Sequence, residues 1–227
     1  SPSSGATAGL ARGAEILTID GVDLVNAPDQ ASVDTLNAGL SPKAVGESHV
    51  FGVRDLGSTT TRDVTLTSQN VVNASVMNVK VINTATGPVG YVQFNDHLAG
   101  AEAGMFNAIT TLKAANITDL VLDIRYNGGG YLDIANEVAY MVAGSTPTAG
   151  KTFEKTTFND KYPNTNPVTG ATLQPDTFLT TTQGLGSMSG NQALPTLNLS
   201  RVFVLTGGDT CSASESIING LRGVDVE

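Results

Sequence analysis

The stretch from Ile117 to Gly130 constrains the fold of this chain more than any other part of its sequence. Ile117–Ile124 is a nearly unbroken apolar run, which is typical of a parallel strand buried on both faces. It leads into Asn127-Gly128-Gly129-Gly130, and Tyr131–Val142 then carries apolar residues at helical spacing. A strand, a glycine turn and a helix in this order predict an α/β unit whose turn lies at the carboxyl end of a parallel strand.

The same order recurs near the end of the chain. Val202–Leu205 predicts a short apolar strand, a glycine-containing turn follows, and a helix is expected over about Ala213–Leu221. Upstream, a strand at Gly90–Phe94 precedes a helix at Ala101–Ala115. Residues 144–198 are poor in apolar periodicity and predict loops and hairpins, with a strand-like hint at residues 152–158. We therefore assign residues 76–227 to one α/β domain with a mainly parallel sheet.

A smaller α/β unit is predicted before this domain, and we assign residues 1–70 to it. Its pattern of apolar runs and turn residues predicts a strand, a turn, a helix and two further strands, at Glu15–Ile19, Asp20-Gly21, Ala31–Leu40, His49–Val53 and Val64–Leu66.

Composition excludes several classes of function. The net charge is −9 and the 12 Lys and Arg residues are scattered, which argues against nucleic acid as a partner. The single cysteine rules out an internal disulfide, and two histidines leave little material for a zinc site, so we expect neither a metal nor a cofactor. No apolar stretch approaches the roughly 20 residues that span a membrane. Abundant Thr, Asn, Ser and Gly with few lysines favour a periplasmic or secreted protein, and the opening at Ser1 resembles a mature or trimmed start.

Ser212 is the candidate nucleophile, because it lies between a strand end and a helix start. Unpaired N–H groups and the dipole at a helix N-terminus favour negative charge, and the N–H of Ala213 could stabilise an oxyanion. The alternative is that Ser212 or Thr210 merely caps the helix, which is the commoner role for such a residue. Cys211 has no obvious histidine partner, and we expect it to be a buried, inert thiol.

The glycine turn at residues 128–130 also follows a buried strand and begins a helix. Its N–H groups could hold an anion. A nucleotide phosphate is disfavoured, because the spacing fits neither Gly-x-Gly-x-x-Gly nor a Walker loop and no lysine follows. A tight turn that needs positive φ explains part of the pattern in any case.

Two sequence blocks resemble those of the tail-specific peptidases, peptidase family S41. Asp123-Ile124-Arg125-Tyr126-Asn127-Gly128-Gly129-Gly130 is similar to the family's Asp-Leu-Arg-x-Asn-x-Gly-Gly block, and Thr210-Cys211-Ser212-Ala213-Ser214-Glu215 to its Thr-Ala-Ser-Ala-x-Glu block. The resemblance implies a ClpP/crotonase-like α/β catalytic core. It also implies that Ser212 is the nucleophile and that backbone N–H groups of Gly129 and Ala213 form the oxyanion hole.

The N-terminal unit resembles part of a PDZ domain. The glycine-punctuated stretch from Gly9 to Gly21 is similar to the central part of such a domain. The loop that would bind a peptide carboxylate is expected before Ser1, so we expect a partial PDZ-like domain.

The general base is the open question. The resemblance implies a lysine after the nucleophile helix and the next strand, and the last lysine here is Lys161, so we expect the base beyond Glu227 and the chain to be a fragment of a longer enzyme. His97 is the alternative base within the chain, although a partly exposed structural role is favoured for it. Glu215 is expected either to hydrogen-bond near the site or simply to complement the helix dipole.

These observations favour a serine endopeptidase that acts on proteins or peptides, through their C-termini in the tail-specific manner. The alternative is a catalytically silent protein on the same fold that binds peptides or lipids. Ester hydrolysis is a third, lesser possibility. Homo-oligomer formation stays open.

Overall fold

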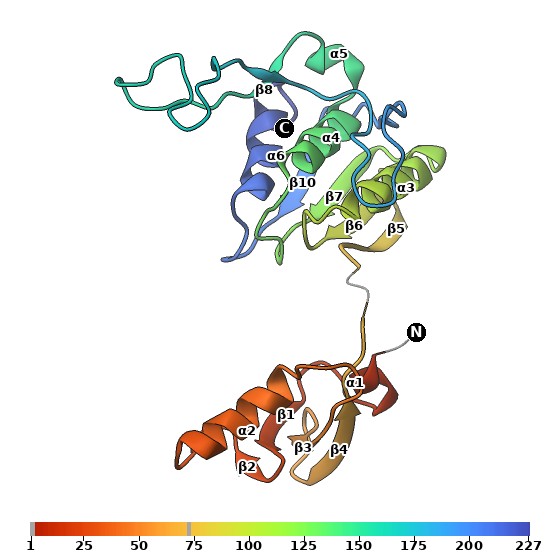
Figure 1. Ribbon diagram of the computed structural model, residues 1–227. Helices are drawn as coiled ribbons and strands as arrows, with labels where there is room; N and C mark the ends of the chain where they lie inside the picture. The colour runs from red at the N-terminus through yellow and green to blue at the C-terminus, as the bar shows by residue number, and fades with distance from the viewer. Residues whose placement is uncertain (1–2, 72–73) are drawn as a thin grey trace. The chain divides into compact units, whose positions relative to one another are not determined.

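The computed structural model describes residues 3–71 and 74–227 of the chain. The chain divides into two compact units, Ser1–Asn73 and Ala74–Glu227 (Figure 1).

The first unit is a four-stranded antiparallel sheet with two helices. The sheet has the order β2-β1-β3-β4. Its elements are α1 (Ser4–Thr7), β1 (Glu15–Ile19), β2 (Val22–Asp23), α2 (Gln30–Leu40), β3 (Ser48–Arg54) and β4 (Thr61–Thr67). The strands and the longer helix expected from the sequence are confirmed to within three residues at each end.

Local chemistry explains the turn and the helix start in this unit. Asp20 and Gly21 both have positive φ, 50° and 81°, as a tight turn between two antiparallel strands requires. The Asp29 carboxylate accepts a hydrogen bond from Ser32 N–H at 2.8 Å and caps α2. Gly39 then lets α2 approach Ile19 on β1 with no room for a Cβ atom. The PDZ-like nature of the unit stays a prediction.

The second unit is built on a mixed sheet of mostly parallel strands. Its order is β10-β7-β6-β5, in which β6, β7 and β10 are parallel and only β5 is antiparallel to its neighbour. The elements are β5 (Val76–Thr84), β6 (Gly87–Phe94), α3 (Ala101–Ala114), β7 (Asp119–Asp123), α4 (Leu132–Ala143), α5 (Ser145–Thr148), β8 (Thr152–Glu154), β9 (Asp176–Thr177), β10 (Val202–Leu205) and α6 (Ala213–Arg222). The α/β class with a mainly parallel sheet is confirmed.

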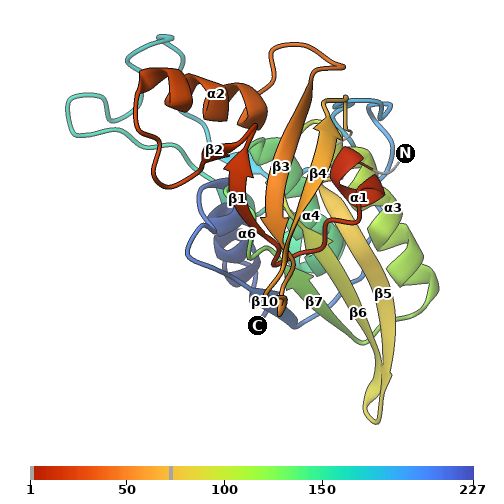
Figure 2. The ribbon, with the colours of Figure 1, turned by 90° about the horizontal axis from the view of Figure 1, so that it is seen from below.

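Helices α3, α4 and α6 cover one face of this sheet (Figures 1 and 2). Alternation along β6 agrees with that arrangement, since Val92 and Phe94 are fully buried while Gln93 between them is half-buried. α4 is apolar around most of its surface and lies at the centre of the core. Within the described residues, no helix is both long and apolar enough to span a membrane.

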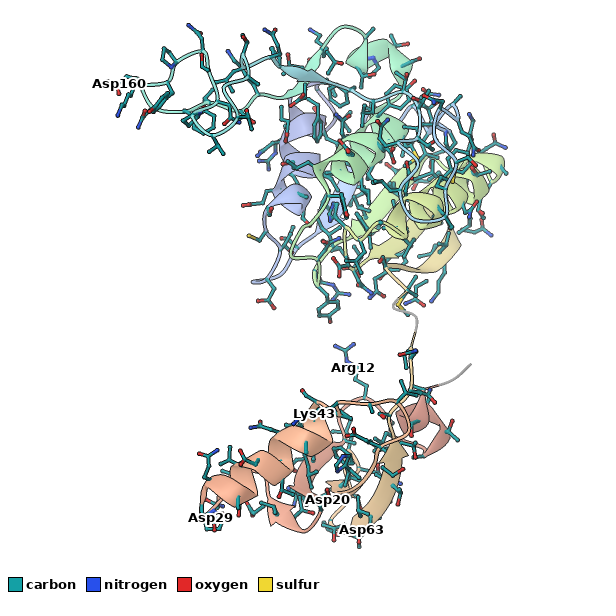
Figure 3. All side chains as sticks on the ribbon, in the orientation of Figure 1. Arg12, Asp20, Asp29, Lys43, Asp63 and Asp160 are labelled. Carbon is teal, nitrogen blue, oxygen red and sulfur yellow. The ribbon has the colours of Figure 1, made fainter. Side chains whose placement is uncertain are left out.

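The segment between α4 and β10 is mostly irregular, as the sequence predicts. It runs outward between β8 and β9, with Asp160 far from the body of the unit (Figure 3). The strand-like hint at residues 152–158 is only partly right, because β8 covers Thr152–Glu154 alone. Its partner is β9, more than 20 residues further along the chain.

Buried polar groups of α3 and α4 hold the returning part of this segment. Glu102 accepts hydrogen bonds from the backbone N–H groups of Gln183, Gly184 and Leu185, and Glu137 accepts a second one from Gln183. Both carboxyl groups are 1% exposed. Burial and the adjacent Glu102 raise the pKa of Glu137 to about 9, so Glu137 is the protonated member of the pair at neutral pH.

The proton on Glu137 makes the free energy of unfolding depend on pH. An unfolded glutamate loses its proton near pH 4.5, whereas the folded chain retains the Glu137 proton up to about pH 9. The folded state therefore binds more protons between these values, and the free energy of unfolding decreases as the pH rises through that window.

Glu137→Gln is expected to remove this dependence. The amide can donate to Glu102 and accept from Gln183 without binding a proton, so we expect the variant to be more stable than the parent at pH 8 by about 1–2 kcal/mol and by less at pH 5. Urea unfolding followed by circular dichroism at both pH values measures the difference. Asp160→Asn, which alters an exposed carboxylate in the loop between β8 and β9, is the control, and an unchanged pH slope in Glu137→Gln would contradict the assignment.

Candidate active site

Two loops meet at the carboxyl edge of the parallel strands. β7 and β10 are adjacent and in parallel register, with Leu205 opposite Asp123 at their ends. The loops at residues 124–131 and 206–212 therefore leave the sheet side by side. This edge is where ligands and catalytic groups gather in open α/β sheets.

Hydroxyl groups fasten these loops to each other. Thr210 Oγ1 donates to Ile124 O at 2.8 Å and accepts from Gly207 N–H at 2.9 Å. Ser214 Oγ, which is fully buried, donates to Asn127 O at 3.0 Å. The Thr210 hydroxyl thus bonds to the neighbouring loop and to Gly207, and not to the first N–H groups of α6. The proposed capping role of Thr210 is wrong. Its link to the first loop instead fixes where Ser212 lies.

Thr210→Val is expected to lower the free energy of unfolding by about 1–2 kcal/mol, because it removes two hydrogen bonds, the one donated to Ile124 O and the one accepted from Gly207 N–H. Thr210→Ser keeps the hydroxyl and should lose less than half as much. Urea unfolding of the two variants measures the difference. Equal losses would show that the threonine methyl group, and not the hydroxyl, matters here.

Ser212 has a strained backbone. Its φ is 55° and its ψ is −123°, a combination that L-residues rarely adopt, and it directly precedes α6. Glu215 in the first turn of α6 accepts a hydrogen bond from Ser212 N–H at 3.0 Å, and the Ser212 side chain faces the Glu215 N–H in return, so the two residues form a capping box. Ser212 therefore does cap α6, as the alternative from the sequence has it, and its role as a nucleophile stays a prediction. An ordinary N-cap has extended backbone. Strain of this kind is more typical of a strand-to-helix turn that exposes a nucleophile.

The glycine turn packs directly against Ser212. Gly129 has φ of 108°, and a Cβ atom added there would lie 2.7 Å from Ser212 Cβ and 3.0 Å from Ala213 N. No residue other than glycine fits at this position. The structure thus brings together Ser212, Ala213 and Gly129, the three residues that the sequence assigns to one site.

The two predicted oxyanion donors differ in their hydrogen bonding. Ala213 is the first residue of α6, so its N–H has no acceptor within the helix. Gly129 N–H donates to Asn127 Oδ1 at 3.0 Å instead of pointing to an open position. The role of both residues in an oxyanion hole stays a prediction, and for Gly129 it requires the amide to leave Asn127.

His97 is fully buried, so the expectation that it is partly exposed is wrong. Its Nδ1 lies 2.8 Å from Asn127 Oδ1 and its ring packs 4.4 Å from that of Phe94. Burial lowers the pKa of His97, which keeps the ring neutral. The other ring nitrogen, Nε2, has no hydrogen-bond partner among the described residues, so no such bond links His97 to Ser212. A general-base role has no supporting contact.

Cys211 is exposed, and the expectation of a buried thiol is also wrong. The turn before α6 leaves the sheet edge toward solvent, so Cys211 and Ser212 both lie at the surface. Neighbouring Ala213 and Ser214 are instead buried under the helix. Residue types alone do not show which side chains of such a glycine-rich loop face solvent and which face the core. The exposure of Cys211 could therefore not be predicted from the sequence.

An open groove of about 400 Å³ contains Ser212. Its walls come from α4, from α6 and from the end of β8, through Leu132, Glu154, Lys155, Thr156, Glu215, Ser216 and Asn219. A groove that is open to solvent and runs past an exposed serine can accommodate an extended chain.

Asp123 anchors the start of the first loop. Its carboxylate pairs with Arg125, with Nη2 at 2.7 Å, and accepts the Tyr91 hydroxyl at 2.6 Å. Arg125 and then Tyr91 stabilise the ionised form and lower the pKa of Asp123 to about 2. These groups support the site without facing Ser212, and sequence reasoning did not identify Tyr91. The described residues contain no group of three or more His, Cys, Asp or Glu that could hold a metal ion.

Comparison with known proteins agrees with this geometry. The family model of peptidase family S41 matches residues 88–226, which include both loops and the groove around Ser212. The chain belongs to peptidase family S41. The matched region lies within the second unit, and no curated protein sequence matches the chain.

One solved structure of an S41 protein shares the fold of this chain. A crystal structure of a candidate S41 protease from Bacteroides fragilis is 24% identical, with a TM-score of 0.63, over 96% of this chain and 53% of that one. The photosystem II D1 C-terminal processing protease is 21% identical over 96% of this chain and 51% of its own, with a TM-score of 0.45. The chain thus spans about half the length of these two S41 proteins.

Proposed function

We propose that this S41 peptidase chain is a serine endopeptidase that cleaves peptide bonds through an acyl-enzyme on Ser212. The observation that carries the proposal is the strained, exposed Ser212 at the N-terminus of α6, packed against Gly129 at the edge of the parallel sheet. Family membership supports proteins or peptides as the substrates.

The chemistry follows from this arrangement. Ser212 Oγ attacks the scissile carbonyl carbon, and its proton passes to a general base. The oxyanion forms beside the N–H of Ala213 and the positive end of the α6 dipole. The C–N bond then breaks, the leaving amine takes the proton, and water releases the acyl group from Ser212.

For the base we propose a lysine beyond Glu227, as the resemblance implies. The described residues offer no better candidate. His97 Nδ1 lies at Asn127 Oδ1, and His97 Nε2 has no hydrogen-bond partner among these residues. A neutral lysine matches the task of accepting a serine proton in a desolvated site.

Substrate selection is the least constrained part of the proposal. We propose that an extended peptide lies in the Ser212 groove, beside the end of β8, and that the PDZ-like first unit helps to bind or gate a protein C-terminus. A periplasmic or secreted location fits the composition. The alternative of a silent peptide- or lipid-binding protein is favoured by the occupied Gly129 amide and by the lack of a general base in contact with Ser212 among the described residues.

Labelling with a fluorophosphonate tests the nucleophile. The reagent forms a bond between Ser212 Oγ and phosphorus and expels fluoride, and the adduct is located by mass spectrometry of the tryptic peptide. Labelling and cleavage are measured on the full-length enzyme, which includes the proposed lysine, here and in the tests that follow. We expect one adduct per folded molecule, on Ser212, and cleavage of an unfolded protein substrate. A folded full-length enzyme without an adduct on Ser212 would contradict the proposal and favour the silent binding protein.

A further inference from the structure

The Gly129 amide belongs to a chain of buried hydrogen bonds that reaches His97. Gly129 N–H donates to Asn127 Oδ1 at 3.0 Å, and His97 Nδ1 lies 2.8 Å from the same oxygen. Asn127 Nδ2 donates to Phe94 O at 3.0 Å, so the amide orientation of Asn127 is set by three partners. Because Oδ1 can only accept, His97 carries its proton on Nδ1.

The backbone of His97 also forms hydrogen bonds with the glycine turn and with Tyr131. His97 N–H donates to Gly129 O at 3.2 Å, and Tyr131 N–H donates to His97 O at 3.0 Å. A Cβ atom on Gly130 would lie 2.6 Å from His97 O, so the two segments are in close contact at this point. These contacts hold Gly129 O and Gly130. The part of the turn that they leave free to rotate is the Gly128–Gly129 peptide, which carries the Gly129 N–H, and the φ of 108° at Gly129 suits glycine alone.

An oxyanion beside Ser212 and Asn127 Oδ1 compete for the same amide. If Gly129 N–H turns toward the oxyanion, its hydrogen bond to Asn127 Oδ1 breaks. That oxygen is buried, since Asn127 is 0% exposed. A buried acceptor without a donor is strongly unfavourable. His97 Nδ1–H stays on that oxygen throughout, so Asn127 Oδ1 is never left without a donor.

We propose that His97 is a positioning residue, which keeps Asn127 Oδ1 hydrogen-bonded while the Gly129 amide turns from Asn127 to the oxyanion. The inference rests on the proposed function. It adds that Gly129 N–H has two acceptors in turn, Asn127 Oδ1 in the resting state and the oxyanion during the reaction. His97 acts through Asn127 and does not touch the substrate. Its role is to lower the free-energy difference between the resting and the oxyanion-binding arrangement of the turn.

Two substitutions at His97 separate this role from its rivals. In His97→Asn the side-chain amide nitrogen can take the place of Nδ1, whereas in His97→Gln it reaches the position of Nε2. We expect the rate of fluorophosphonate labelling of Ser212 to stay within about threefold in His97→Asn and to fall by about tenfold or more in His97→Gln. Thermal unfolding of both variants controls for a general loss of structure. Equal losses in both would overturn the inference, as would a total loss in His97→Asn, which would indicate a general base.

Nuclear magnetic resonance of the unmutated chain provides a second test that does not depend on folding of the variants. We expect a proton on Nδ1 and none on Nε2 of His97, and a shift of the Gly129 amide signal when the phosphonyl oxygen takes the place of the oxyanion. An adduct on Ser212 with an unmoved Gly129 signal would overturn this inference and leave the nucleophile intact. Failure of Ser212 to react at all would instead overturn the proposed function, and the inference with it.

Discussion

Ser212→Ala is expected to reduce fluorophosphonate labelling and peptide cleavage to background, a loss of at least about 10³-fold. The substitution removes the only atom that can form the acyl bond, while the turn and the buried neighbours Ala213 and Ser214 are unchanged. Mass spectrometry of the labelled chain and a cleavage assay on an unfolded protein measure the effect. Ser216→Ala alters another serine that lines the same groove, and it should label normally.

The strain at Ser212 makes a further distinction between two inactive variants. Alanine must adopt the same φ of 55° and ψ of −123°, whereas glycine adopts this conformation without a steric penalty. Ser212→Gly is therefore expected to be more stable than Ser212→Ala by about 1 kcal/mol in urea unfolding. Equal stability would indicate that the backbone at Ser212 is relaxed, and residual cleavage by either variant would exclude Ser212 as the nucleophile.

Gly129→Ala is expected to be the second most damaging change, with labelling of Ser212 reduced by about 100-fold or more. The new Cβ atom would lie within 3.1 Å of Ser212 Cβ, Ala213 N and Cys211 O, and alanine is strained at a φ of 108°. The turn must shift away from α6, which displaces a predicted oxyanion donor from the nucleophile. The rate of fluorophosphonate labelling measures the loss.

Gly128→Ala is the matched control, one residue earlier in the same turn. A Cβ atom there meets only Asp209 O, at 3.7 Å, an ordinary contact, and Gly128 lacks positive φ. Labelling should stay within about threefold of the parent. If both alanine variants labelled at the parent rate, the packing of Gly129 against Ser212 would have no part in the reaction.

Most of the fold could be predicted because local pattern and burial agree along the second unit. Five of the eight residues in Ile117–Ile124 are apolar, with Leu120–Leu122 at the centre, and β7 is buried at four of its five positions, as a strand covered on both faces requires. Ser212 and Gly129 could be placed in one site because parallel neighbouring strands bring their following loops to the same edge. Residues 152–158 were harder, since β8 finds its partner only after a long loop.

The errors concern side chains whose surroundings come from distant parts of the chain. His97 resembles an exposed loop residue in sequence, but Asn127, 30 positions away, and the ring of Phe94 enclose it. Cys211 looks like a small core residue, yet the turn directs it to solvent. Thr210 looks like a cap, and it instead bonds Ile124 across the site.

The sequence by itself determined the α/β class, the order of the strands and helices in the second unit, and the two turns that hold Ser212 and Gly129. These features depend on periodicity and glycine content, which are local properties of the chain. Only the tertiary structure decided which acceptor the Gly129 amide meets, how deeply His97 is buried and that Ser212 has a strained backbone. Those properties depend on contacts between β6, β7 and α6, which no single stretch of sequence contains.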